Sequence, residues 1–295
     1  MDAYRRNRKA ILLFLLPALF IYTCLTMLPI LASFGFAFTS WHGITGEAIK
    51  YAGISNFTKL LKDEFFWISL KNIALFMVLT LDIQIPVGFV AALLLSKGLK
   101  FSKMFRTIIF LPQIVSITAT SLIWYFILLP NDGVLTTLLT MIGFGEYARN
   151  WLVDSHTAMV SIILVNAWIG VGFHMTVFSA AIAGIPKDIE DAAQIDGVTG
   201  LKRIVSIIIP LVWESMKICV IIVVTAVLKA FDVVFVMTQG GPNGLTQVPT
   251  TLLYDQAFRY DNYGIASAIS ILIFLLSISI TILSLKILQR DTLEY

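Results

Sequence analysis

The sequence predicts an all-α, polytopic membrane protein with six transmembrane helices. Hydrophobic residues make up 58% of the 295 residues and charged residues only 13%, and the mean hydropathy is +0.88. Soluble domains carry about half apolar and about a quarter charged residues. Runs such as 271–276 are apolar on every side, whereas the strands of a membrane barrel alternate apolar and polar residues. The chain is therefore expected to cross the membrane as helices.

Six apolar stretches are long enough to cross a bilayer core of about 30 Å, which needs about 20 helical residues. The basic run Arg5, Arg6, Arg8 and Lys9 precedes the first stretch, which is too long for a signal peptide and lacks a clear cleavage site. We therefore expect an uncleaved first span. The predicted spans cover residues 10–38, 72–96, 107–129, 156–183, 211–235 and 263–288.

The lysines and arginines predict that both termini are cytoplasmic. With that orientation, thirteen basic residues lie in cytoplasmic segments and six in external ones. Four of those six lie in one long first loop, and long loops weigh less in the positive-inside rule. Lys217 and Lys229 fall inside the fifth span.

No catalytic or metal site is expected in this chain. The glycine cluster at 240–244 lacks the lysine of a phosphate-binding loop, and the three histidines are scattered. Cys24 and Cys219 lie in apolar spans and are expected to be small buried hydrophobic residues. The sequence also shows no matched pair of broken helices of the kind found in many secondary carriers.

The segment 184–210 is polar, although it lies between two apolar spans. Pro186 suits the first turn of a helix, acidic residues at 188, 190 and 191 suit its positive end, and Gly197 can take the left-handed conformation that ends it. A helix of about three turns is too short to be stable alone, so it should lean on another surface.

Two short helices are expected in this segment. Ile185, Ile189, Ala192 and Ala193 form the predicted inner face of the first, and Leu201, Ile204, Val205 and Ile208 have helical spacing in the second. The first helix could lie on the lipid surface as an amphipathic helix. Three acidic residues facing an anionic leaflet argue against that interpretation.

One pattern in this segment resembles a known family. The pattern consists of Asp191-Ala192-Ala193, then Gly197 after three residues, Ile207 after a further nine, and Ile209-Pro210 after one more. It resembles the Glu-Ala-Ala loop of binding-protein-dependent ABC importer permeases. Ile185-Pro186 and Ile195-Asp196-Gly197 look like the carbohydrate branch. Asp191 replaces the usual glutamate and Ile209 the usual leucine. Leu16-Pro17, Phe105-Arg106, Leu111-Pro112, Phe231-Asp232 and the run 237–242 extend the resemblance over nearly the whole chain.

The resemblance implies a transmembrane subunit of an ATP-driven importer of a sugar or oligosaccharide, in a bacterial or archaeal cytoplasmic membrane. Residues 1–71 would form the tail, first span and external loop, 72–290 the transmembrane domain with its coupling loop at 184–210, and 291–295 a cytoplasmic tail. Expected partners are a second, homologous permease subunit, two ATPase subunits that bind ATP and Mg²⁺, an extracellular solute-binding protein, the carbohydrate and membrane lipid. This chain would hold no cofactor and bind no nucleic acid. The implied ATPase-coupling residues are Ile185, Pro186, Ile189, Asp191, Ala192, Ala193, Asp196 and Gly197.

Polar residues inside spans mark a candidate substrate path, because charged groups there cost about 2.5 to 3.5 kcal/mol. Asn166 and His174 lie near one helical face with Trp168 on a neighbouring one, and an amide and an indole suit a sugar ring. The alternative is that Asn166 and His174 bridge packed helices. Asp82, beside Gln84 and before Pro86, would contact substrate or repair a proline kink.

Lys229 and Asp232 are three residues apart and would form an ion pair along the fifth span or a gate for the substrate. Gly240, Gly241 and Pro242 would face the binding protein or form a plain turn. Two other functions stay open. An ion-coupled secondary carrier of small polar solutes would use Asp82, Lys229 and Asp232 as a charge relay, and a scaffold protein would transport nothing.

Overall fold

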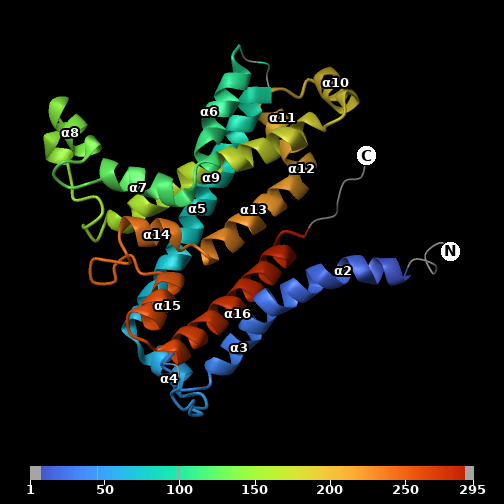
Figure 1. The fold of residues 1–295 in the computed structure, drawn as a ribbon. Coiled ribbons are helices and arrows are strands. Elements are labelled where there is room, and N and C mark those ends of the chain that lie inside the picture. The colour runs from blue at the N-terminus through green and yellow to red at the C-terminus, as the bar shows by residue number, and fades with distance from the viewer. Residues whose placement is uncertain (1–7, 45, 97, 99, 290–295) are drawn as a thin grey trace. The chain divides into compact units, whose positions relative to one another are not determined.

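The computed structural model describes residues 8–44, 46–96, 98 and 100–289. The chain divides into two compact units (Figure 1). Unit 1 comprises Met1–Asp63 and Leu253–Phe274, and unit 2 comprises Glu64–Leu252 and Leu275–Tyr295. Among the described residues the regular structure is helical, apart from one isolated bridge between Thr39 and Tyr51. The predicted all-α class is confirmed.

Unit 1 contains the first predicted span and part of the last one. Ala37 and Ala268 are fully buried, and the rings of Phe34 and Phe57 pack around them. The Asn56 amide donates to the carbonyl oxygens of Ala37 and Thr39, both at 2.8 Å, so it fixes the end of the first span. The elements are α2 (Arg8–Tyr22), the π-helix η1 (Thr23–Met27), α3 (Leu28–Phe36), α4 (Ser55–Lys62), the end of α15 (Pro249–Phe258) and the first part of α16 (Tyr263–Ile287).

Unit 2 is built around α9, which packs along α5 and also contacts α6 and α13. Its buried apolar side chains form two clusters, one that includes Phe76 and Ile162 and one that includes Phe178 and Cys219. The elements are α5 (Glu64–Ser96), α6 (Ser102–Ile114), α7 (Ile117–Ile127), α8 (Val134–Met141), η2 (Gly145–Tyr147), α9 (Ala158–Ala183), α10 (Lys187–Ile195), α11 (Gly200–Arg203), the π-helix η3 (Ile204–Ile208), α12 (Ile209–Leu211), α13 (Trp213–Leu228) and α14 (Asp232–Met237).

Four helical segments of the described chain are long and apolar enough to cross a membrane, and there are six if each of two bent pairs counts as one span. The four are Leu13–Phe36, Glu64–Ser96, Ala158–Ala183 and Tyr263–Ile287. The pair Ser102–Ile114 and Ile117–Ile127 bends by 97°, and the pair Gly200–Leu211 and Trp213–Leu228 bends by 72°. Helices lie in all six predicted spans, and they amount to six candidate spans if each bent pair is counted as one. The third is not the straight helix that we expected, and the 72° bend lies at the start of the predicted fifth span, 211–235.

The breaks have local causes. Val115 and Ser116 have extended ψ angles of 142° and 133° between α6 and α7. Ser116 follows Ile114 and Val115, and β-branched residues and serine favour the helix less than straight-chain residues do. The fifth predicted span is interrupted again between Leu228 and Asp232, where the Thr250 hydroxyl donates to the freed carbonyl oxygen of Ala230.

Glycines bring the helices of unit 2 into close contact. A methyl group on Gly172 would overlap the backbone of α6 at Ile109 and Phe110, and one on Gly88 would overlap His174. In Figure 1, α5 ends and α6 begins at the same end of unit 2 at which α10 and α11 lie. We call it the α10 end.

Candidate functional site

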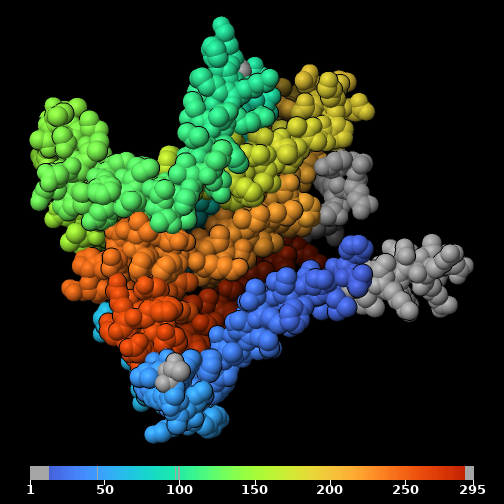
Figure 2. Space-filling view, in the orientation of Figure 1, coloured from blue at the N-terminus to red at the C-terminus, as the bar shows by residue number. Residues whose placement is uncertain are grey.

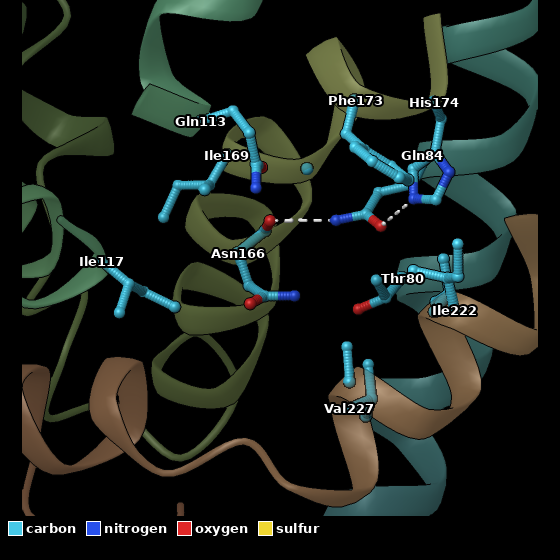
Figure 3. A pocket seen from close by; sticks show the side chains of 13 residues that line it. Thr80, Gln84, Gln113, Ile117, Asn166, Ile169, Phe173, His174, Ile222 and Val227 are labelled. Carbon is cyan, nitrogen blue, oxygen red and sulfur yellow. Dashed lines mark hydrogen bonds between the residues drawn. The ribbon is translucent and has the colours of Figure 1, made fainter. Parts of the chain in front are cut away.

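A partly open cavity of about 250 Å³ lies in unit 2, between α5, α6, α7, α9 and α13, and several polar side chains interrupt its mostly apolar lining. Asn166, Gly170 and His174 line it from α9, as the sequence predicted for one helical face. Thr80 and Gln113 line it as well, although the sequence did not single them out. In Figure 3 the Asn166 amide and the Thr80 hydroxyl point toward one another across the cavity, and the Gln113 amide reaches in from α6.

Gln84 crosses from α5 to α9 and forms one wall of the cavity. Its amide nitrogen donates to the carbonyl oxygen of Asn166 at 3.0 Å, and its amide oxygen lies 3.1 Å from His174 Nε2 (Figure 3). Since this oxygen can only accept, Nε2 carries the imidazole proton. Gly170 makes room, because a methyl group there would overlap the Gln84 amide. Gln84 therefore joins two helices, and it does not repair a kink at Pro86.

The cavity also has unused hydrogen-bonding capacity. Thr80 is fully buried, and its hydroxyl has no partner among the described residues. His174 is 2% exposed, and its Nδ1 likewise has no partner in the described part of the chain. The Asn166 side chain is half-buried beside them. The Thr80 hydroxyl and the Asn166 amide point into the cavity (Figure 3), and Ile169 and Phe173 form apolar walls.

Trp168 lies away from this cavity. It is 46% exposed and packs edge to face on Trp124, with ring centroids 5.5 Å apart, at a separate apolar hollow. Trp168 is two residues from Asn166, which places it about 200° around the helix. The expected pairing of an amide and an indole in one site is therefore wrong within this chain.

The charged residues of the candidate path are not assembled either. Asp82, Lys229 and Asp232 are exposed in the isolated chain, and none of them lines the cavity. Lys229 caps the end of α13 and Asp232 begins α14, and the ion pairs of the described residues do not include these two. The predicted ion pair along one helix is wrong because the helix ends at Leu228. In the described residues, no three His, Cys, Asp or Glu side chains are placed to hold a metal ion.

The segment after α9 forms the two predicted short helices, and α10 ends in a Schellman motif. The N–H of Val198 donates to the carbonyl oxygen of Ala193 at 2.8 Å, and that of Gly197 to Gln194 at 3.1 Å. Gly197 has a φ of +67°, which confirms the predicted left-handed end. Pro186 is the residue before the helix, with a ψ of 138°, so α10 begins one residue later than expected.

The two faces of this segment differ in part from the prediction. Ile185 and Ala193 are buried. Ile189 packs against the apolar cluster that contains Ile185 and Phe178, but Ala192 is exposed. The π-helix η3 widens the turn, so Ile204 and Ile208 face inward while Leu201 and Val205 are exposed. The outward face of α10 and α11 carries Asp188, Asp191, Ala192, Ile195, Asp196 and Leu201, all of them exposed. Ile195 is 86% exposed and Leu201 is 75% exposed.

Glu190 and Arg203 connect α10 to α11. Their side chains form an ion pair with an Nη2 to Oε1 distance of 2.5 Å, and both are about one third exposed. An ion pair at such a position contributes little stability by itself. The pair links the side chains of α10 and α11, and the two helices together form one projection, which is yellow in Figure 2.

The turn between α14 and α15 is built by side-chain contacts. The Thr238 and Thr246 hydroxyl oxygens lie 2.7 Å apart, and the Thr246 hydroxyl donates to the carbonyl oxygen of Gly241 at 2.8 Å. Gly240 is buried with a φ of +81°. Because Gly241 and Pro242 are half-buried, the exposed part of the turn is carried by Asn243 and Leu245.

Asn72 anchors this turn to α5, and replacing it is expected to loosen the turn. Its amide donates to the carbonyl oxygens of Leu245 at 2.9 Å and Gln247 at 2.8 Å. Asn72→Leu leaves two carbonyls unpaired, at a cost of about 1 to 3 kcal/mol. Hydrogen exchange at the Thr246 and Gln247 amides should become about tenfold faster or more. Asn150→Leu, at an exposed position, should leave the exchange rate of these two amides unaltered. Equal exchange rates in the two variants would show that Asn72 does not anchor the turn.

Comparison with protein-family models identifies the family to which this chain belongs. The model of the "binding-protein-dependent transport system inner membrane component" matches residues 84–293, which is more than half of the chain. The chain belongs to this family. It is therefore a multi-pass membrane protein, and the matched region contains the cavity residues from Gln84 onward and the whole α10–α11 projection.

Named relatives of similar length agree with the family. The chain is 31% identical over 291 residues to the probable ABC transporter permease protein YurN of Bacillus subtilis, covering 98% of this chain and 99% of that protein. It is 31% identical to the lactose transport system permease protein LacF of Rhizobium radiobacter, covering 90% and 89%. A bacterial ABC transporter that imports the acidic polysaccharide alginate has the same fold, with a TM-score of 0.84, 22% identity and coverage of 99% and 100%.

Proposed function

We propose that this chain is the transmembrane subunit of an ATP-driven importer that translocates a sugar or oligosaccharide delivered by an extracellular binding protein. The observation that carries the proposal is a cavity in unit 2, with hydrogen-bonding side chains set in a mostly apolar lining, in a chain of this family. Lactose and alginate, named for two relatives, are both carbohydrates, and carbohydrates present many hydroxyl groups that both donate and accept hydrogen bonds.

The cavity suits that chemistry. The Asn166 and Gln113 amides can each donate to one sugar hydroxyl and accept from another, and the unpaired Thr80 hydroxyl can do the same. Phe173 offers an apolar face to the carbon side of a sugar ring. A second, homologous permease chain would complete the path, because the cavity is partly open in the isolated chain.

The α10–α11 projection would couple this chain to two ATPase subunits, which would bind ATP and Mg²⁺. The apolar side chains of Ile195 and Leu201 are exposed on this projection, and they would be covered by the ATPase. Asp191, Ala192, Asp196 and Gly197 lie on the same exposed surface. Ile185, Ile189 and Ala193 would act indirectly, by seating α10 on the rest of unit 2.

We further propose that the α10 end faces the cytoplasm, with both termini on that side, and that the turn after α14 faces the binding protein. Lys100, Lys103 and Arg106 lie at or near the start of α6, at the same end as α10 (Figure 1). This placement agrees with the excess of lysine and arginine expected on the cytoplasmic side.

Reconstitution tests the proposal. With a second permease chain, the ATPase and the binding protein present, sugar should stimulate ATP hydrolysis. Asn166→Leu keeps the number of side-chain heavy atoms but removes one hydrogen-bonding amide, which is worth about 1 kcal/mol, so half-maximal stimulation should need about five- to tenfold more sugar. Asn150→Leu, at an exposed position, is the matched control.

One result would contradict the importer, and another would contradict the role of the cavity. Uptake by this chain alone, abolished by an uncoupler and indifferent to the ATPase, would establish the ion-coupled carrier instead. An Asn166→Leu complex with the sugar dependence of the wild type would remove the cavity from the substrate path.

A further inference from the structure

A second hollow lies at the α10 end of unit 2, where α13 begins and α16 ends. It has a volume of about 400 Å³ and is distinct from the cavity described above. Glu214, Lys217 and Ile221 line it from α13, and Leu285, Lys286 and Gln289 line it from the end of α16. All of these residues belong to unit 2.

The hollow has an excess of positive charge. Lys217 Nζ lies 2.5 Å from Glu214 Oε1, and the Lys217 side chain is only 15% exposed. Lys286 is exposed, and the ion pairs of the described residues do not include it. Two ammonium groups thus face one carboxylate. The described residues that line the hollow thus carry one net positive charge beside the apolar side chains of Ile221 and Leu285.

A specific contact holds the two walls together. The Trp213 indole N–H donates to the carbonyl oxygen of Leu288 at 3.1 Å, so it fixes the end of α16 to the start of α13. Tryptophan is enriched at the depth where membrane meets water. This enrichment and the proposed orientation favour a position of the lysines at the level of the lipid head groups, and Ile221 lies about two turns beyond Trp213 along α13.

We propose that this hollow binds the phosphate group of an anionic phospholipid of the cytoplasmic leaflet, with Lys217 and Lys286 on the phosphate and the acyl chain along Ile221 and Leu285. Basic pockets between transmembrane helices on the cytoplasmic side suit anionic head groups. The apolar floor favours a lipid over a free phosphate ion, which would gain nothing from it. The inference rests on the orientation given under the proposed function.

The test uses the full-length chain, reconstituted in phosphatidylcholine vesicles with an increasing fraction of phosphatidylglycerol. Native mass spectrometry of the extracted chain counts the phosphatidylglycerol retained. Each lysine near an anionic surface is worth about 1 kcal/mol, so Lys286→Gln and Lys217→Gln should each lower the apparent affinity about fivefold. Lys286→Arg should retain lipid, because it keeps the charge.

Glu214→Gln gives the sharpest result. It removes the carboxylate that competes for Lys217, so phosphatidylglycerol retention should rise about fivefold. A salt bridge with a purely structural role would predict no gain. Lys59→Gln removes the same charge at an exposed position of α4 and should leave retention unchanged.

Three outcomes would overturn the proposal: wild-type retention in Lys286→Gln, an equal loss in Lys59→Gln, or displacement of the lipid by millimolar inorganic phosphate, which would indicate a free-phosphate site. Thermal denaturation of each variant separates lost binding from lost folding. Lipid retention needs no ATPase or binding protein. A negative result would therefore leave the importer standing, and failed sugar-stimulated hydrolysis would not affect the lipid measurement.

Discussion

Gly197→Pro is expected to abolish sugar-stimulated ATP hydrolysis by the reconstituted complex while the chain still inserts into the membrane. Gly197 has a φ of +67°, and proline is restricted to about −65°. The substitution also removes the N–H that donates to Gln194, so the Schellman motif at the end of α10 is lost. The exposed surface that includes Ile195 and Leu201 would then lose its fixed geometry. The measurement is hydrolysis with and without sugar, beside a membrane-extraction assay for insertion.

Gly143→Pro is a closely matched control for this experiment. Gly143 ends α8 with a φ of +86°, and its N–H donates to Thr140, while the N–H of Phe144 donates to Leu139 in a second Schellman motif. Both glycines have open space where a side chain would begin. Loss of stimulated hydrolysis in Gly197→Pro but not in Gly143→Pro would assign the effect to the α10 projection. Intact stimulation in Gly197→Pro would show that this projection does not transmit the ATPase motion.

Gly172→Leu is expected to separate α6 from α9. A single methyl group on Gly172 would already overlap the backbone at Ile109 and Phe110, and backbone cannot rotate away as a side chain does. Overpacking of a well-packed interior costs about 1 to 3 kcal/mol, and a clash with backbone lies at the upper end. We expect the free energy of unfolding in detergent to fall by about 3 kcal/mol, with a lower yield of folded chain.

Gly35→Leu provides the comparison, because Gly35 is also inside a helix, but a methyl group on it would have no neighbouring atom within 4 Å. It should unfold at the temperature of the wild type or slightly above, since glycine weakens a helix by about 1 kcal/mol relative to alanine. If Gly172→Leu were as stable as Gly35→Leu, the close approach of α6 and α9 would not be a requirement of the fold.

The sequence predicted the spans well because their signal is length and composition. The breaks at 115–116 and after Leu228 were missed, since neither contains glycine or proline and apolar residues continue on both sides of each break. In lipid a broken helix is tolerated only where side chains or a cavity satisfy the freed backbone groups. Here the Thr250 hydroxyl does so for Ala230, and Thr250 is twenty residues away in the sequence.

The candidate site was predicted in part. Asn166 and His174 were found because they share a helical face with Gly170, which is local information. Thr80 and Gln113 were missed because they come from other helices, and only the tertiary structure brings them to α9. One signal was present for Thr80, which lies four residues before Gln84 and so shares its face of α5. The exposure of Ala192 could not be predicted, because it depends on which face of α10 packs against the rest of unit 2.

The bridge made by Gln84 restricts how the cavity can change shape. Its amide is committed on both sides, to the backbone of Asn166 and to the His174 ring, so a ligand cannot pull α5 away from α9 without breaking two buried hydrogen bonds. These two helices therefore stay together while the cavity changes shape. A cycle that widens and narrows the cavity has to move the other walls, α7 and α13, and both of them begin at a sharp bend that can serve as a hinge.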